Sequence, residues 1–121
     1  QIPDLPSHYE ASAPGVGFAA GGGVAKAVEE VIHRLHPEVE VKTAAAEGLN
    51  ECRKMLRIAR TGKYDGYLLE GMACPGGCIA GAGTLADPAR SAMMLNKYKA
   101  QATMKTAADT PYKDTLDKLK Y

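Results

Sequence analysis

Apolar residues recur at intervals of three and four along several stretches of this chain, a spacing that predicts helices with one buried face. The predicted helices cover residues 24–35, 48–61, a long stretch that begins at Pro88, and about 111–119. The first should end before Pro37, because the residue preceding a proline avoids the α-helical conformation. Asp87 should cap the helix that begins at Pro88, since its side chain can accept hydrogen bonds from the open N–H groups of the first turn.

Three shorter stretches are predicted as strands. Residues 38–42 alternate valine with charged residues, as in a strand with one buried face, and residues 67–69 are a short apolar run. Residues 15–20, Gly-Val-Gly-Phe-Ala-Ala, are expected to be a short buried strand that leads into a tight turn at residues 21–23. Residues 1–14 contain three prolines and are expected to form an irregular lead-in.

Strands and helices therefore alternate along the chain and are followed by two helices. Such alternation favours parallel strands joined by crossover helices. The expected fold class is α/β: a small, mainly parallel sheet with flanking helices and two C-terminal helices, formed by residues 15–121 as one segment. Ligands of such sheets gather at the carboxyl ends of the strands. We therefore expect the functional site in the loop after the strand at 67–69.

Composition and charge narrow the range of functions. The chain is 45% hydrophobic and 24% charged, which is ordinary for a globular protein, and its net charge of +1 gives no reason to expect nucleic acid as a partner. No apolar run approaches the ~20 residues that span a membrane. Three cysteines are a poor disulfide framework, so we expect a reducing compartment, the cytoplasm. Because the chain has no initiator methionine, we expect it to be a piece of a longer protein.

Two of the cysteines, Cys74 and Cys78, enclose only Pro-Gly-Gly. Soft thiolates at this spacing suit zinc, copper(I) or an iron–sulfur cluster. Gly76 and Gly77 leave the backbone between them free of side chains, so that it can approach such a group closely. Two thiolates do not complete a metal site, and further ligands are expected from elsewhere. On spacing alone, half of a structural zinc site, a redox pair and two inert thiols remain open.

The flanking residues favour iron. Residues 72–78, Met-Ala-Cys-Pro-Gly-Gly-Cys, closely resemble the last cluster-binding motif of the iron-only, or [FeFe], hydrogenases. Residues 15–28 resemble the glycine-rich turn that precedes this motif in the same family, and the Gly-Lys-Tyr-Asp turn at 62–65 is also family-like. The resemblance covers roughly residues 14–85. It implies that residues 15–121 are the C-terminal segment of the hydrogenase catalytic domain.

The resemblance also assigns roles. The catalytic H-cluster of this family is a [4Fe-4S] cubane joined through a cysteine sulfur to a di-iron subcluster, and the reaction is the reversible reduction of protons to H2. Cys74 matches a terminal cubane ligand and Cys78 the ligand whose sulfur bridges to the di-iron unit. Met72 matches a methionine that lines the di-iron pocket. Gly76 and Gly77 match the backbone that approaches the cluster and offers amides to its sulfides.

The sequence departs from the family pattern in two respects. The first two cysteine motifs of the family are absent, so we expect the isolated chain to bind no cluster and to be inactive. Its expected partners are the missing N-terminal part of the same domain, a ferredoxin-type electron carrier and, through self-association, a second copy of the chain. Residues 81–85 read Gly-Ala-Gly-Thr-Leu instead of the commoner Gly-Gly-Gly-Gln-Pro, as in a divergent branch. The alternative function is an iron–sulfur carrier or sensor without H2 turnover.

Three other features have competing interpretations. Gly15, Gly17 and Ala20 formally satisfy a dinucleotide-binding fingerprint, but no apolar strand precedes them. Glu70 is either a proton relay near the motif or, more simply, a carboxylate that caps or pairs at the end of a strand. Cys52 lies on a helical face and is expected to be a core thiol rather than a ligand.

Overall fold

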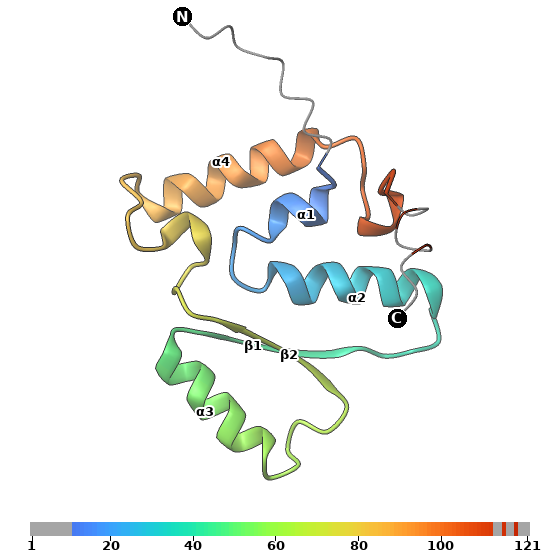
Figure 1. Ribbon diagram of the computed structural model, residues 1–121, viewed down its shortest axis with the longest axis vertical. Coiled ribbons are helices and arrows are strands. Elements are labelled where there is room, and N and C mark those ends of the chain that lie inside the picture. Colours follow the sequence, from blue (N-terminus) through green and yellow to red (C-terminus); the bar gives the residue numbers. More distant parts are fainter. Residues whose placement is uncertain (1–10, 113–114, 116–117, 119–121) are drawn as a thin grey trace, which may run out of the picture.

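The computed structural model describes residues 11–112, 115 and 118. Its centre is a two-stranded parallel sheet of β1 (Lys42–Glu47) and β2 (Tyr67–Met72). The strands pair in register, from Lys42 opposite Tyr67 to Glu47 opposite Met72. Helix α3 (Leu49–Ala59) connects the strands and packs on one side of the sheet, and α2 (Gly23–Leu35) packs on the other (Figure 1).

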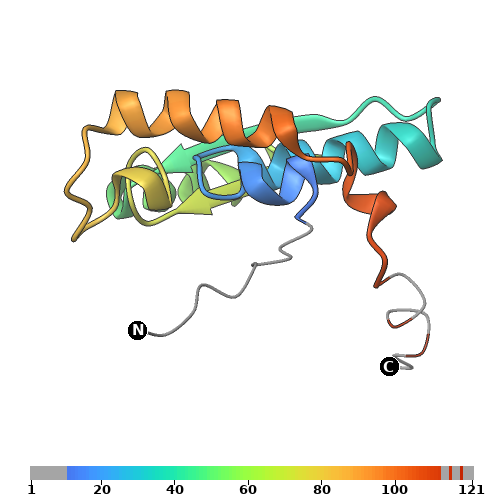
Figure 2. The ribbon, with the colours of Figure 1, turned by 90° about the horizontal axis from the view of Figure 1, so that it is seen from above.

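Two further helices lie beyond α2. The short helix α1 (Ala13–Gly17) contacts both α2 and the long helix α4 (Pro88–Gln101), so that α4, α1, α2, the sheet and α3 follow one another down the molecule (Figure 1). The 3-10 turns η1 (Cys78–Ala80) and η2 (Ala107–Asp109) complete the described elements. Seen from above, they form a flat slab (Figure 2). Among the described residues, no helix is both long and apolar enough to cross a membrane.

The structure confirms the α/β fold class and most of the predicted elements. The helices expected at 24–35, 48–61 and from Pro88 are α2, α3 and α4, and the strand expected at 67–69 is the first half of β2. Asp87 caps α4 as predicted, because its Oδ1 accepts from the N–H of Arg90 at 2.9 Å. Residues 1–10 of the expected lead-in, and most of the helix expected at 111–119, lie outside the described residues.

The strand predicted at residues 15–20 is wrong, because α1 occupies this stretch. The helix is capped at its N-terminus: the Oγ of Ser12 accepts from the N–H of Gly15 at 3.1 Å, and Pro14 lies in the first turn. Gly23, in the tight turn predicted at 21–23, allows close packing on this helix. A side chain at Gly23 would collide with the carbonyl of Gly17, so α1 meets the start of α2 backbone to backbone.

The strand predicted at 38–42 is displaced. β1 covers Lys-Thr-Ala-Ala-Ala-Glu at 42–47, whereas Val39 is 44% exposed and lies outside any strand. Alanine has little intrinsic preference for strands. The position of β1 is set by its pairing with β2, in which Lys42 lies opposite Tyr67, and by the helices on either side of the sheet.

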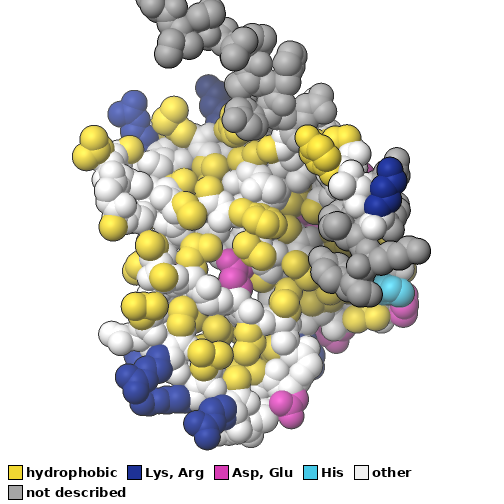
Figure 3. Space-filling view, viewed as in Figure 1, with side chains coloured by type: hydrophobic (Ala, Val, Ile, Leu, Met, Phe, Trp, Pro, Cys, Tyr) yellow, Lys and Arg dark blue, Asp and Glu magenta, His cyan; other side chains and the backbone are white. Residues whose placement is uncertain are grey.

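The described residues bury few large side chains. The buried hydrophobic residues are Ala13, Ala25, Ala27 and Met55, and no large side chain of the described part is fully buried. Many large apolar side chains are exposed instead, including Phe18, Leu35, Leu49, Leu56, Leu85, Met93 and Met94. In the space-filling view, hydrophobic side chains cover the middle of one face, and Lys and Arg lie towards its periphery (Figure 3). Much apolar surface is therefore left uncovered by these residues.

Candidate metal centre

The two closely spaced cysteines lie in a loop directly after β2, at the carboxyl edge of the sheet. We call residues 73–81 the cysteine loop. Cys74 is half-buried, Cys78 at the start of η1 is exposed, and neither forms a disulfide. A methyl group on Gly81 would lie 3.5 Å from the Sγ of Cys74, so this sulfur lies close to the end of the loop. The loop thus presents two free thiols from one short stretch of backbone.

The cysteine loop rests on the glycine turn, residues 18–22, which joins α1 to α2. The N–H of Ile79 donates to the carbonyl of Ala19 at 3.2 Å. Gly77 is buried, and its φ of 79° is a conformation that favours glycine. A Cβ on Gly77 would lie 2.6 Å from the carbonyl oxygen of Ala19 and 2.8 Å from the nitrogen of Gly21. The loop and the turn therefore touch through their backbones, and only glycine fits at this contact.

The end of β1 holds the other side of the loop. Glu47, the last residue of β1, accepts through Oε2 from the N–H of Gly76 at 2.7 Å. The N–H of Gly48 donates to the carbonyl of Met72 at 2.8 Å, just before the loop begins. The N–H of Gly77 donates within the loop to the carbonyl of Cys74 at 3.1 Å. The N–H groups of Gly76 and Gly77, expected from the sequence to serve a cluster, thus donate to Glu47 and Cys74 in this structure.

Glu70 holds the end of the glycine turn through hydrogen bonds. Its side chain is 9% exposed, and its two oxygens accept from the N–H of Gly22 at 3.1 Å and of Ala25 at 2.8 Å. Both donors belong to the N-terminal end of α2, where Gly22 has no side chain of its own to act as a cap. Of the two interpretations of Glu70 from the sequence, the structure thus supports the cap at the end of a strand.

Cys52 on α3 contacts the end of β2 at Met72. The thiol of Cys52, half-buried on α3, donates to the carbonyls of Ala46 at 3.4 Å and Met72 at 3.6 Å, as expected of a core thiol. Met72 is half-buried and ends a groove of about 270 Å³ between α2 and β2, whose lining also includes Val24, Val28 and Leu68. This groove is apolar apart from Glu70.

The donor set fits part of an iron–sulfur site. Nowhere among the residues that the structure describes do three or more Cys, His, Asp or Glu side chains converge as a metal site. Two soft thiols on a loop with bare glycine backbone are the ligands that an iron–sulfur cluster takes from one segment of its protein. The remaining ligands have to come from other residues.

Comparison with known proteins identifies the family of this chain. The family model of the iron-only hydrogenase large subunit, C-terminal domain, matches residues 2–82. This chain belongs to that family. A search of curated protein sequences gave no match. The family match spans both the glycine turn and the cysteine loop, the two segments that the structure brings into contact, and the hydrogenase family implies an H-cluster in the parent protein.

The dinucleotide interpretation of Gly15, Gly17 and Ala20 does not hold in this hydrogenase domain. A dinucleotide fingerprint follows a strand, whereas Gly15 and Gly17 lie within helix α1. The turn after α1 supports the cysteine loop instead.

Two groups that hold the cysteine loop, Glu47 and the carbonyl of Ala19, are not among the residues singled out from the sequence. Nothing in the local pattern marks them, since each acts on residues far along the chain. A usable signal existed for Glu47: it ends a strand parallel to β2 and thus reaches the same edge of the sheet as the cysteine loop.

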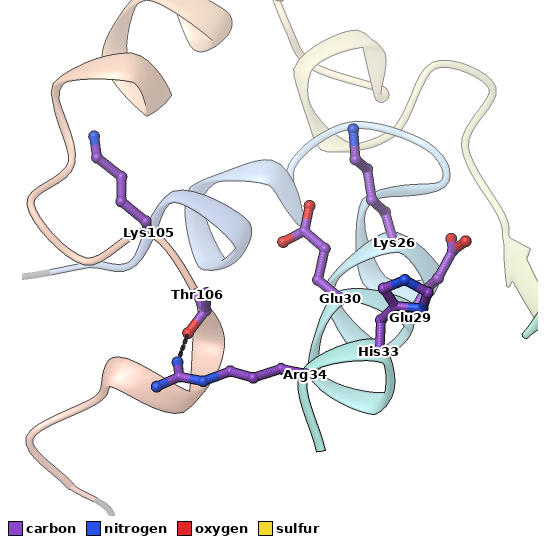
Figure 4. Close-up of a pocket in the computed structure, with 7 residues that line it drawn as sticks. All are labelled: Lys26, Glu29, Glu30, His33, Arg34, Lys105 and Thr106. Carbon is purple, nitrogen blue, oxygen red and sulfur yellow. Dashed lines mark hydrogen bonds between the residues drawn. The ribbon is translucent and has the colours of Figure 1, made fainter. Parts of the chain in front are cut away.

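A larger pocket of about 650 Å³ lies away from the cysteines, between α2 and the segment after α4 (Figure 4). It is lined by Lys26, Glu29, Glu30, His33, Arg34, Lys105 and Thr106. Arg34 donates from the rim to Thr106 at 2.7 Å and to Asp109 at 2.8 Å, and this guanidinium is the main reason that the pKa of Asp109 is lowered to about 2. The pocket has charged walls of both signs and no thiol, so it is separate from the candidate metal centre.

Proposed function

We propose that this chain supplies two of the cysteine ligands of the H-cluster in an iron-only hydrogenase that interconverts protons and H2 in the cytoplasm. Cys74 serves as a terminal ligand of the [4Fe-4S] cubane, and Cys78 as the ligand whose sulfur bridges to the di-iron subcluster. The observation that supports this most is the loop itself, which carries two free thiols and is held through its backbone by the glycine turn and Glu47. When bound, the cluster would pass electrons from the external carrier to its iron, at which protons would be reduced.

The residues of the chain have distinct tasks in this proposal. The exposed thiol of Cys78 is available for a shared ligand position, whereas the half-buried thiol of Cys74 binds from inside the loop. Gly77 keeps the loop tight against the glycine turn, which fixes the backbone between the two sulfurs. Met72 adds an apolar, polarisable wall next to the di-iron unit and helps to keep water from it.

The expected partner of this chain is the rest of the same catalytic domain, which would cover its exposed apolar side chains. The chain contains three cysteines, and Cys52 is occupied with backbone carbonyls, so a cubane with four ligands needs two more from elsewhere. The exposed apolar side chains of the described residues are of the kind that another part of a domain covers. We therefore expect the isolated chain to be inactive, and the complete protein to exchange electrons with a ferredoxin-type carrier.

Cysteine variants of the complete protein, matured with its di-iron unit, test these roles. Cys78→Ser should abolish H2 evolution, because the sulfur that links cubane and di-iron unit is lost. Cys74→Ser should retain a trace, since another ligand can replace one terminal thiolate. Cys52→Ser is the matched control and should keep the iron content of the unsubstituted protein. Equal residual activity in the Cys74 and Cys78 variants, at equal iron content, would contradict the bridging role.

An iron–sulfur carrier or sensor is the second candidate. It is favoured by residues 81–85, which depart from the commoner family sequence, and by Leu85, which is fully exposed just after the cysteine loop. The same preparation distinguishes the two functions. A protein that holds a complete cluster, seen by its paramagnetic resonance spectrum, yet neither evolves nor oxidises H2 would be a carrier or sensor.

A further inference from the structure

Glu70 stands out because it is the charged residue that the described part of the chain buries. It lies on β2, two residues before Met72 and four before Cys74. A buried carboxylate is costly unless it is paired or hydrogen-bonded. The salt bridges found within the described residues involve Arg34, His36 and Lys54, none of which reaches Glu70.

Backbone amides balance the charge of Glu70 instead. One oxygen accepts from the N–H of Gly22 and the other from the N–H of Ala25, at 3.1 and 2.8 Å. These groups are at the positive end of the 13-residue helix α2. Because both oxygens are used, the carboxylate clamps the last residue of the glycine turn and the first turn of α2 to β2.

This clamp holds the end of the same turn whose backbone contacts the cysteine loop. The glycine turn presents the carbonyl of Ala19 to the N–H of Ile79, and Gly77 packs against the same stretch of backbone. The cysteine loop itself begins just beyond Glu70 on β2. Glu70 therefore fixes the support of the loop relative to the strand from which the loop starts.

We propose that Glu70 is a positioning residue: its bidentate hold on the N-terminus of α2 sets the place of the glycine turn, and through it the place of the Cys78 thiol. The relevance of this to a cluster rests on the function proposed above, but the coupling from Glu70 to the cysteine loop does not. Glu47 provides the contrast, because it gives a single oxygen to a single N–H of the loop.

The chemical difference between these two carboxylates defines the experiment. In Glu70→Gln, one accepting oxygen becomes an NH2 group that faces an N–H donor, so one of the two hydrogen bonds is lost. In Glu47→Gln, the remaining oxygen can still accept from Gly76. The full 121-residue chain, free of metal, is examined by NMR hydrogen exchange of the backbone amides and by the rates at which iodoacetamide alkylates Cys74 and Cys78.

In Glu70→Gln, exchange should accelerate by about tenfold or more at whichever of Gly22 and Ala25 faces the new NH2 group, since that donor is left without its acceptor. The amides of residues 76–79 should follow, and the ratio of Cys78 to Cys74 alkylation should change by about threefold or more. In Glu47→Gln, the amides of Gly22 and Ala25 should stay within about twofold of the unsubstituted chain. If Glu70→Gln does not fold, Glu70→Asp, which keeps the charge but is too short to reach both donors, should show the same pattern.

Two results would overturn the proposal. Faster exchange spread evenly over β1, β2 and α3 would mean that Glu70 only contributes to overall stability. Loosening of the turn without any change at residues 76–79 or at Cys78 would mean that the turn does not position the loop. Iron content of the matured complete protein is measured separately. Failure of the unsubstituted protein to load a cluster would count against the proposed function and would leave the exchange result, which needs no iron, unaffected.

Discussion

Replacement of Gly77 by alanine tests the central contact of the site, where the cysteine loop meets the glycine turn. Gly77 has φ 79° and ψ −164°, a region that is essentially confined to glycine, and an alanine held there is strained by about 1–3 kcal/mol. The new methyl group would lie 2.6 Å from the carbonyl oxygen of Ala19 and 2.8 Å from the nitrogen of Gly21. Both are backbone atoms, so no side chain can turn away to make room.

Relief of this collision requires the loop and the turn to separate. Forcing an additional methyl into a packed site costs about 1–3 kcal/mol, so Gly77→Ala should lower the free energy of unfolding by about 2–6 kcal/mol. This is a large part of the roughly 5–15 kcal/mol that stabilises a typical domain. Gly66→Ala is the matched control. Gly66 has φ 78°, but no atom lies within 4 Å of the place that a methyl group would take there, and the left-handed backbone alone costs about 1–2 kcal/mol.

Urea unfolding of the chain, followed by circular dichroism, gives both free energies. Hydrogen exchange then shows which backbone amides lose protection, and we expect this loss at residues 18–22 and 73–81. A Gly77→Ala variant whose stability equals that of Gly66→Ala, within about 0.5 kcal/mol, would refute the close approach of loop and turn.

Three further outcomes are expected. Met55→Ala should lower the free energy of unfolding by about 2–4 kcal/mol in the same urea titration, because Met55 is 7% exposed, whereas Leu56→Ala, at a position 59% exposed, should cost less than about 1 kcal/mol. Arg34→Gln should return the pKa of Asp109 from about 2 towards its ordinary 3.8 in an NMR titration; since the folded pKa is the lower one, this pair stabilises the fold above about pH 4 and loses its effect as the pH falls towards 2. The metal-free chain should associate with rising concentration, because its exposed apolar side chains lack a cover, and a clean monomer in sedimentation at every concentration would contradict this.

Local signals were enough to predict the helices α2, α3 and α4. The apolar spacing of α2 and α3 is regular, and Asp87 caps α4 as its position before a proline suggests. The error at α1 arose from two conflicting local signals. Gly-Val-Gly-Phe suggested a buried strand, whereas Ser12 followed by Pro14 is a cap and a first turn, and the structure follows the latter.

The limits of β1 could not be derived from local sequence. Three successive alanines carry no alternation and little strand preference, while Val39 and Val41 just before them do. The limits of β1 are set by its pairing with β2, because residues 42–47 are the ones that lie opposite β2. No local sequence pattern indicates which residues a strand will pair with.

The site shows the same division. Cys74 and Cys78 could be chosen from their spacing and the glycines between them, since the chemistry of thiolates is local. The partners of the residues that hold the loop could not be derived from local sequence, because Glu47 lies 29 positions from Gly76 and Glu70 lies 45 positions from Ala25. Such carboxylates look like ordinary surface residues until the fold brings them to backbone N–H groups.

The hydrogen bond from the N–H of Ala13 to the carbonyl of Met104, at 2.8 Å, has a consequence for how this block of sequence can be moved between proteins. It places the first residue of the segment 13–104 beside its last residue. A segment whose ends meet can be grafted into a surface loop of another protein without pulling that loop apart. Recombination could therefore transfer the sheet, the glycine turn and the cysteine loop together as one cassette.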